Sequence, residues 1–208
     1  MRHFFYSVIF VLFLLTPHSH VSAATDGDSK EAIKKVEQYL QDLKTGRARF
    51  VQTANDGTQF VGTFYLERPG KLRFEYDPPN EDFIVADGVF IYFYDSKLGE
   101  QTNAPIGSTL ADFFLRKDLK LSGDITVQNV KRTDEYLMIE LTQADDPQGG
   151  TLTLAFDEDP MTLKKWRVVD AQGMITEVEL FYLKTGITHS GDLFAYYNPK
   201  SGKPNYNK

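Results

Sequence analysis

The sequence predicts a mainly β protein with some α structure (α+β), in which one large antiparallel sheet has its concave face covered by helices. One early segment carries apolar residues at spacings of three and four, which is typical of an amphipathic helix. From Arg47 onward apolar and polar residues alternate, and Gly, Pro, Asn and Asp separate the alternating runs, as in successive β-hairpins. A meander of this many strands cannot stay flat, so we expect the sheet to curl.

The first residues have the pattern of an export signal. Phe4 to Leu15 is an apolar run of signal-peptide length, well short of the roughly 20 residues that a spanning helix needs. The small residues within Val21 to Ala24 suit signal peptidase. We therefore expect a signal peptide over residues 1–23, cleaved after Ala23 or Ala24, and a single domain over residues 24–208. An uncleaved membrane anchor is the alternative interpretation.

The first element of the mature chain is predicted to be a helix from Asp28 to Lys44. Asp28 with Glu31 resembles a capping box, and Gly46 stands where a helix stop is expected. The apolar residues of this helix form one stripe, made of Ile33, Val36, Leu40 and Leu43.

Strands fill most of the remaining chain. We predict them near residues 47–54, 59–67, 71–77, 82–86, 89–95, 124–132, 135–143, 150–157, 163–170, 174–184 and 192–197. Pro105 to Leu115 interrupts this series, because Ser108 can cap a short helix that carries Leu110, Phe113 and Phe114. Two short apolar helices would fill or cover the concave face of the sheet. The tail from about residue 198 has the composition of a weakly ordered terminus.

Composition excludes several classes of protein. Without cysteine the chain has no disulfide, no thiolate zinc site and no acylated Cys of the kind that begins a mature lipoprotein. Arg2 is the only formal charge in the leader, so its removal takes the net charge from −6 to −7. This charge argues against binding to nucleic acid or to anionic membranes. We expect a soluble, exported and unanchored protein.

The mature sequence offers little that could carry catalysis. His189 is its only histidine and has no cysteine or second histidine to work with. The acidic run from Phe156 to Pro160 lacks the spacing of a calcium loop and is better explained as a solvated hairpin turn. There is no phosphate-binding Gly-rich loop and no nucleophile elbow. We predict no catalytic residue, no metal and no cofactor, so the chain is a binding protein rather than an enzyme.

Apolar residues share one face of two neighbouring strands. Phe64 and Leu66 lie on one face of the first, and the same parity continues to Arg68; Leu72, Phe74 and Tyr76 lie on one face of the next. These side chains either pack a plain core or line a cavity beneath a lid of helices. In the second case Arg68 would bind backbone carbonyls of the lid, and otherwise it points into water. Lys71, Arg73 and Glu75 are expected to face water.

The same segment resembles a known family. Phe50-Val51-Gln52, the run GTFYLERPGKLRFEY from Gly62 to Tyr76, Pro79 and the run IVADG from Ile84 to Gly88 follow each other in the order and spacing of the periplasmic outer-membrane lipoprotein carriers, the LolA family. Weaker similarity extends to Leu110 to Phe114 and to Asp192 to Phe194. Tyr65 and Phe74 stand where many members carry Trp.

The resemblance implies an incomplete, unclosed antiparallel β-barrel whose open side is covered by a lid of helices over a cavity for acyl chains. It assigns Arg68 as the lid latch. For the cavity it implies Leu72, Phe74 and Tyr76, and together with strand parity we predict the sheet positions Phe50, Phe64, Leu66, Leu72, Phe74, Tyr76 and Ile84. The apolar residues of the two helices are predicted to form the lid, namely Ile33, Val36, Leu40, Leu43, Leu110, Phe113 and Phe114.

The resemblance also implies a function without catalysis. We expect a monomer in the periplasm that takes acylated lipoproteins from an ATP-driven release complex of the inner membrane and delivers them to an outer-membrane lipoprotein receptor. The alternatives are a periplasmic carrier of another amphiphile, such as a phospholipid or glycolipid, a hydrolase that uses two carboxylates, and an outer-membrane barrel. The charge-dense strands argue against the barrel.

Overall fold

The computed structural model of the chain describes residues 22–23, 26–107 and 110–199. Most of the expected leader, Ser108 and the last part of the tail lie outside these ranges. Among the described residues, no helix combines the length and the apolar character needed to cross a membrane.

The structure is one antiparallel sheet with a long helix and a short one against it. The helix α1 spans Asp26–Asp42, and the 3-10 helix η1 spans Leu110–Leu115. The strands are β1 (Ser22–Ala23), β2 (Thr45–Thr53), β3 (Gln59–Glu67), β4 (Lys71–Tyr76), β5 (Phe83–Asp87), β6 (Phe90–Asp95), β7 (Glu100–Pro105), β8 (Ile125–Arg132), β9 (Leu137–Gln143), β10 (Gly150–Glu158), β11 (Met161–Asp170) and β12 (Ile175–Thr185).

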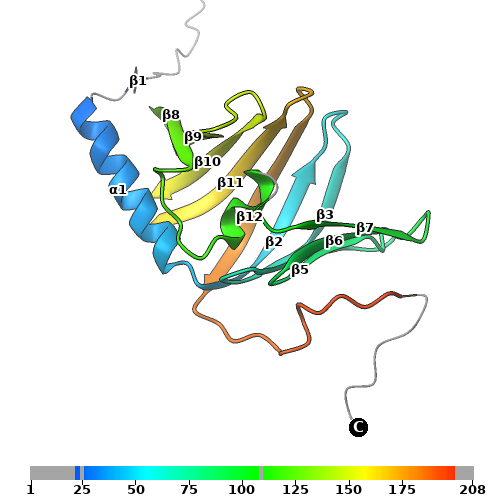
Figure 1. Ribbon diagram of the computed structural model, residues 1–208. Coiled ribbons are helices and arrows are strands. Elements are labelled where there is room, and N and C mark those ends of the chain that lie inside the picture. The colour runs from blue at the N-terminus through cyan, green and yellow to red at the C-terminus, as the bar shows by residue number, and fades with distance from the viewer. Residues whose placement is uncertain (1–21, 24–25, 108–109, 200–208) are drawn as a thin grey trace, which may run out of the picture.

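The sheet consists of two meanders joined by one long-range pairing. The strand order is β1-β8-β9-β10-β11-β12-β2-β3-β4-β5-β6-β7, so β12 returns to lie beside β2. The sheet curls, and Figure 1 shows α1 and η1 on its concave side. Because β7 pairs only with β6 and β8 lies toward the opposite end, the barrel is not closed. The fold class expected from the sequence is therefore confirmed.

Most predicted elements occur within a few residues of their expected positions, with two differences. The predicted strand over residues 192–197 is wrong, since this segment forms turns and irregular chain. The alternation of Phe194 and Tyr196 suggests a strand. These side chains instead pack on the outer face of the sheet, where Tyr196 stacks on Tyr92 with ring centroids 4.6 Å apart. β7 was not expected, because its sequence EQTNAP lacks the β-branched and aromatic residues that mark a strand.

The outer face of the sheet carries a small second core. Phe83, Val85 and Tyr94 are buried there beneath the C-terminal segment, with Tyr196 packed against them. Arg73 was expected to face water, but its side chain is only 16% exposed. Its guanidinium lies 5.0 Å from the centre of the Phe83 ring, and Nη1 donates to the Leu193 carbonyl at 3.5 Å. The prediction that Arg73 faces water is therefore wrong, because the C-terminal segment covers its side chain.

The main core fills the concave side, and one glycine is required for its packing. Phe50 of β2 and Gly62 of β3 are directly opposite each other, and the Phe50 ring is fully buried. A Cβ on Gly62 would lie 2.2 Å from the Glu75 carbonyl oxygen and 2.6 Å from Phe50 Cε1. The missing side chain of Gly62 therefore makes the space that the Phe50 ring occupies.

Gly62→Ala is expected to destabilise the protein by about 1–3 kcal/mol, because the added methyl forces a backbone oxygen and a buried ring to move. Equilibrium unfolding in urea measures this change. The matched control is Gly191→Ala, where nothing lies within 4 Å of the new Cβ, and its effect should stay within about 0.5 kcal/mol. Equal effects of the two variants would contradict the packing argument.

Tyr76 makes the free energy of unfolding depend on pH in the alkaline range. Burial raises the pKa of Tyr76 to about 12 from its ordinary value of 10.0, although its hydroxyl also donates to Gln52 Oε1 at 2.8 Å. Because the folded chain holds the phenolic proton more tightly, this contribution is complete below about pH 10 and is lost as the pH rises toward 12. Tyr76→Phe should therefore lose less stability than the wild type over that window in unfolding measurements. Parallel pH profiles for the two proteins would show that Tyr76 is not responsible.

Candidate functional site

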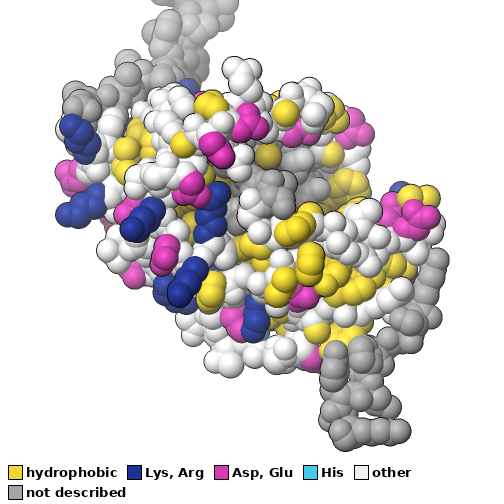
Figure 2. Space-filling model, in the orientation of Figure 1, with side chains coloured by type: hydrophobic (Ala, Val, Ile, Leu, Met, Phe, Trp, Pro, Cys, Tyr) yellow, Lys and Arg dark blue, Asp and Glu magenta, His cyan; other side chains and the backbone are white. Residues whose placement is uncertain are grey.

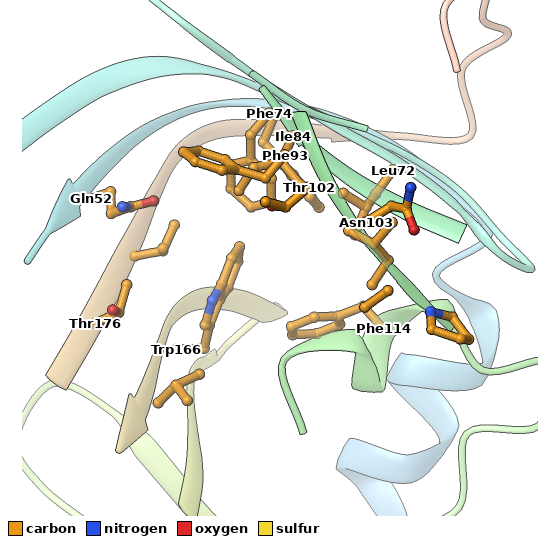
Figure 3. A pocket seen from close by; sticks show the side chains of 16 residues that line it. Gln52, Leu72, Phe74, Ile84, Phe93, Thr102, Asn103, Phe114, Trp166 and Thr176 are labelled. Atoms are coloured by element: carbon orange, nitrogen blue, oxygen red, sulfur yellow. The ribbon is translucent and has the colours of Figure 1, made fainter. Parts of the chain in front are cut away.

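An apolar cavity lies between the two walls of the curled sheet. Its volume is about 420 Å³, within the range of pockets that bind small apolar ligands. Its lining is made of Gln52, Phe64, Leu72, Phe74, Ile84, Ile91, Phe93, Thr102, Asn103, Ala104, Pro105, Phe114, Trp166, Val168, Thr176 and Val178. Figure 3 shows the labelled side chains converging on this space from several strands and from η1.

Strands distant in the sequence form opposite walls of the cavity. β3 to β6 supply one wall, and β11 and β12 supply the other. Trp166, the only tryptophan of the chain, joins the two, with its ring centroid 5.7 Å from that of Phe64 and 5.1 Å from that of Phe114. Edge-to-face and tilted contacts of this kind favour a defined arrangement of the rings. Trp166 and the two aromatic rings that it contacts thus form part of the cavity lining.

The cavity opens toward β7. Thr102 and Asn103 of this strand are exposed, and Phe93 on β6 is 39% exposed although it also lines the cavity. Phe90 is also exposed but lies on the outer face of β6, and the exposed Val89 and Leu98 flank the two ends of this strand. In Figure 2, apolar side chains are frequent on the side of the molecule away from α1, whereas Lys and Arg gather on the side of α1. The mouth of the cavity is thus apolar with a polar strand at its rim.

Arg68 joins both covering elements to the sheet. It follows β3 directly, and its side chain is 8% exposed. Nη1 donates to the carbonyls of Leu40 and Leu43, with the second bond at 3.1 Å. Nη2 donates to the carbonyl of Arg116 at 2.9 Å and to that of Lys117 at 3.4 Å. One guanidinium therefore connects the C-terminus of α1 with the segment that follows η1.

Of these acceptors, the Leu40 carbonyl belongs to the last turn of α1, while the Leu43, Arg116 and Lys117 carbonyls lie just beyond the ends of α1 and η1. The last carbonyls of an α-helix have no intrahelical donor, and the helix dipole makes that end favourable for a cation. Burial lowers the pKa of the Arg68 guanidinium, and the nearby Asp118 carboxylate acts in the opposite direction. The Gly70 N–H, which donates to the Leu115 carbonyl at 2.9 Å, adds a backbone bond between the same parts of the chain.

Further contacts of α1 make it one unit with the segment after η1. Glu37 accepts a bond from the Leu121 N–H at 2.8 Å, and Gln41 Nε2 donates to the Leu119 carbonyl at 3.2 Å. On the sheet side the Tyr39 hydroxyl accepts the Leu163 N–H of β11 at 3.0 Å, and burial raises the pKa of Tyr39. α1 is therefore fastened to two other segments along its length, in addition to the Arg68 bonds.

The sheet positions predicted for the cavity divide into two groups. Phe64, Leu72, Phe74 and Ile84 line the cavity. Phe50, Leu66 and Tyr76 belong to or pack against the adjoining core and are absent from the lining. The Phe50 ring contacts those of Phe74 and Tyr76 at 5.1 and 5.4 Å, so these positions support the wall of the cavity from the side.

The expected covering positions all lie on α1 or η1, apart from Leu43, which follows α1 directly. Val36, Leu40, Leu43, Phe113 and Phe114 are buried, and Ile33 packs against the same core. The side chain of Leu110 lies outside the described part of the structure. Among those whose side chains are described, only Phe114 reaches the cavity lining. The α1 stripe therefore covers the core, and η1 borders the cavity itself.

Sequence reasoning missed the wall formed by β11 and β12. Trp166 and Val168 alternate on β11, and Val178 is buried on β12, so parity could have marked their inward face. The cavity-lining residues Ile91 and Phe93 of β6 were missed as well. Strand parity does not show which faces lie opposite each other across the cavity. That depends on the long-range pairing of β12 with β2.

The other polar candidates lie away from the cavity. His189 is on the outer face, where Nε2 is 3.1 Å from the Leu66 carbonyl oxygen and the ring packs against Tyr65 and Phe194. The acidic run that includes Asp157 is at the hairpin between β10 and β11, where Glu158 pairs with Arg132 at 2.9 Å. Within the described residues no group of three or more His, Asp or Glu side chains is arranged to hold a metal.

Comparison with known proteins identifies the family. Residues 41–197 match the family model described as outer membrane lipoprotein carrier protein LolA. The outer-membrane lipoprotein carrier protein of Methylibium petroleiphilum is 36% identical over 182 residues, which is 81% of this chain and 86% of that protein. Its counterpart in Methylococcus capsulatus is 28% identical over 174 residues, 79% of this chain and 83% of that protein.

A solved structure supports the fold alone. A DUF1329 family protein from Desulfovibrio piger superposes with a TM-score of 0.52 at 12% identity, over 80% of this chain and 97% of that one. The family model covers most of the chain, and the Methylibium relative is similar over most of its own length. The chain therefore belongs to the LolA family of outer-membrane lipoprotein carrier proteins.

Proposed function

We propose that this protein carries outer-membrane lipoproteins through the periplasm with their acyl chains held in the apolar cavity. The observation that carries this proposal is a cavity of about 420 Å³ lined by Phe, Ile, Leu, Val and Trp, beneath covering segments that one buried arginine ties together. The names of the similar proteins support lipoprotein as the cargo.

The size of the hydrophobic effect explains why such a carrier is needed. Each methylene removed from water contributes about 0.8 kcal/mol, so a multiply acylated protein would face a cost on the order of tens of kcal/mol on leaving a bilayer unaided. The aromatic and aliphatic lining replaces most of that apolar environment. We expect the cargo to come from an ATP-driven release complex in the inner membrane and to pass to a receptor at the outer membrane.

A carrier must also release its cargo, and here we assign a role to Arg68. In this mechanism α1 and the segment after η1 form a lid, and entering acyl chains displace it. Displacement breaks the Arg68 bonds to the carbonyls of both lid elements. Part of the hydrophobic gain is offset by the cost of opening, which keeps the affinity moderate and permits transfer to a receptor.

The direct test is native mass spectrometry of the protein purified from an exporting host, with delipidated protein as the reference. A bound acylated species that delipidation removes is expected, and its mass separates a lipoprotein from a free phospholipid or glycolipid. A mass equal to that of the unliganded chain, combined with failure to bind a triacylated cysteine amide, would contradict the carrier function.

Binding can be followed through Trp166, since the single tryptophan lines the cavity. Ile91→Asp places a carboxylate in the lining and should weaken binding of a triacylated cysteine amide at least tenfold, because a charge is costly in an apolar site. The matched control is Val61→Asp on the outer face of β3, where the side chain is 42% exposed and the affinity should not change. Equal affinities of the two variants would place the ligand elsewhere.

Arg68→Leu should load cargo and release it poorly, because the closed, empty state loses charge-assisted bonds worth about 2–3 kcal/mol. We expect transfer of cargo to acceptor vesicles carrying the receptor to slow at least tenfold. Arg73→Leu is the control, since Arg73 is also largely buried but contacts the C-terminal segment instead of the lid. Transfer from Arg68→Leu at the wild-type rate would show that the arginine does not act as a latch.

A further inference from the structure

At one end of the sheet, β7 pairs with another strand on one side only, and it lies beside the cavity mouth. β7 is the last strand in the sheet order and pairs with β6 on one side only. Figure 1 shows it at the end of the sheet away from α1. Among the described residues, no other strand pairs with β7, and Thr102, Asn103 and Pro105 are exposed.

The hydrogen-bond pattern shows which backbone groups point outward. The Ile106 N–H donates to the Val89 carbonyl at 3.1 Å, and the same antiparallel register continues into the pairs Ile91 with Ala104 and Phe93 with Thr102. Hydrogen-bonded pairs alternate along an antiparallel ladder, so Ala104 and Thr102 direct their backbone groups to β6. Gln101 and Asn103 must then direct their N–H and C=O groups away from the sheet.

This edge lacks most features that protect sheet edges. Natural edges are commonly blocked by Lys, by Pro within the strand, by bulges or by a covering segment. β7 carries no Lys, its one Pro is the last residue, Pro105, and its pairing with β6 has no register shift. Its sequence is polar and therefore suited to a peptide partner rather than to lipid. An edge of this kind is a ready site for addition of an extended peptide.

The edge borders the place where an acylated cargo must leave the cavity. Thr102, Asn103, Ala104 and Pro105 all belong to the cavity lining. A lipoprotein carries its acyl chains on the first residue of the mature chain, so chains buried in the cavity hold that residue at the mouth. The polypeptide that follows it begins next to β7.

The geometry points to β7 as a binding site for the N-terminal peptide of the cargo, which adds to the sheet edge as a further strand. This inference rests on the proposed carrier function and adds to it a second, polypeptide contact. Bonds to the free groups of Gln101 and Asn103 involve the peptide backbone alone, so they do not select a cargo sequence. Gln101 and Asn103 are two residues apart on β7, so their outward groups lie about 7 Å from each other along the strand. A general carrier gains affinity in this way without restricting its cargo.

Two probes separate the lipid contact from the peptide contact. One is a triacylated cysteine amide, and the other is the same lipid followed by an eight-residue polar peptide. The longer probe should bind about tenfold more tightly in a Trp166 fluorescence titration, as expected for a few backbone hydrogen bonds. It should also slow hydrogen exchange of the Gln101 and Asn103 amides at least tenfold, whereas the short probe should not. N-methylation of alternate peptide amides should abolish both effects.

Gln101→Pro tests the same backbone hydrogen bonds from the side of the protein. Proline removes one outward N–H and is tolerated on a sheet edge, and Gln101 is not part of the cavity lining. This variant should bind the short probe as the wild type does and lose most of the gain from the peptide. Gln101→Ala keeps the N–H and should retain the gain.

The outcomes distinguish this inference from the function on which it rests. If both probes bind equally and the β7 amides stay unprotected, the edge site is wrong and the carrier function stands. If neither probe binds, the carrier function itself fails. Protection of β7 without any probe, together with a dimer on size-exclusion chromatography, would assign the edge to a second copy of this chain and overturn the inference.

Discussion

The structure depends on one buried guanidinium. Arg68 leaves β3 with the parity of the apolar face, and a charge in that position must find acceptors. It finds them in carbonyls at the C-terminal end of α1 and in the segment that follows η1. The guanidinium supplies hydrogen-bond donors, and the carbonyls of the two segments supply the acceptors. These bonds hold two separate segments over one cavity.

The hydrogen bonds of Arg68 contribute only part of the free energy that holds the covering segments on the sheet. A few charge-assisted hydrogen bonds contribute a few kcal/mol, whereas packing between helices and sheet contributes through many buried side chains. Phe113 and Phe114 are buried, and α1 adds its own apolar stripe. The Arg68 bonds add to this packing a polar connection between β3 and both covering segments.

The two faces of the sheet are packed differently. On the concave face the side chains leave a space, while on the outer face the C-terminal segment packs Tyr196 against Phe83 and Tyr92 and engages Arg73. β3 to β6 form one wall of the cavity, so this outer packing stiffens the wall from behind. The cavity thus lies between a wall that is packed on both faces and covering segments that Arg68 connects to the sheet. The exposed strand at the mouth, β7, remains outside both cores.

Local patterns in the sequence determined the elements and their inward faces. Alternation predicted β3 and β4, the stripe from Ile33 to Leu43 predicted α1, and the order of motifs around Arg68 indicated the family. These features are local because the pleat and the helical turn fix which side chains share a face. The tertiary structure alone decided which faces meet. The pairing of β12 with β2 brings Trp166 opposite Phe74, and the covering segments bring distant carbonyls to Arg68. Periodicity encodes the direction of a side chain and not its partner, since partners are chosen by long-range packing.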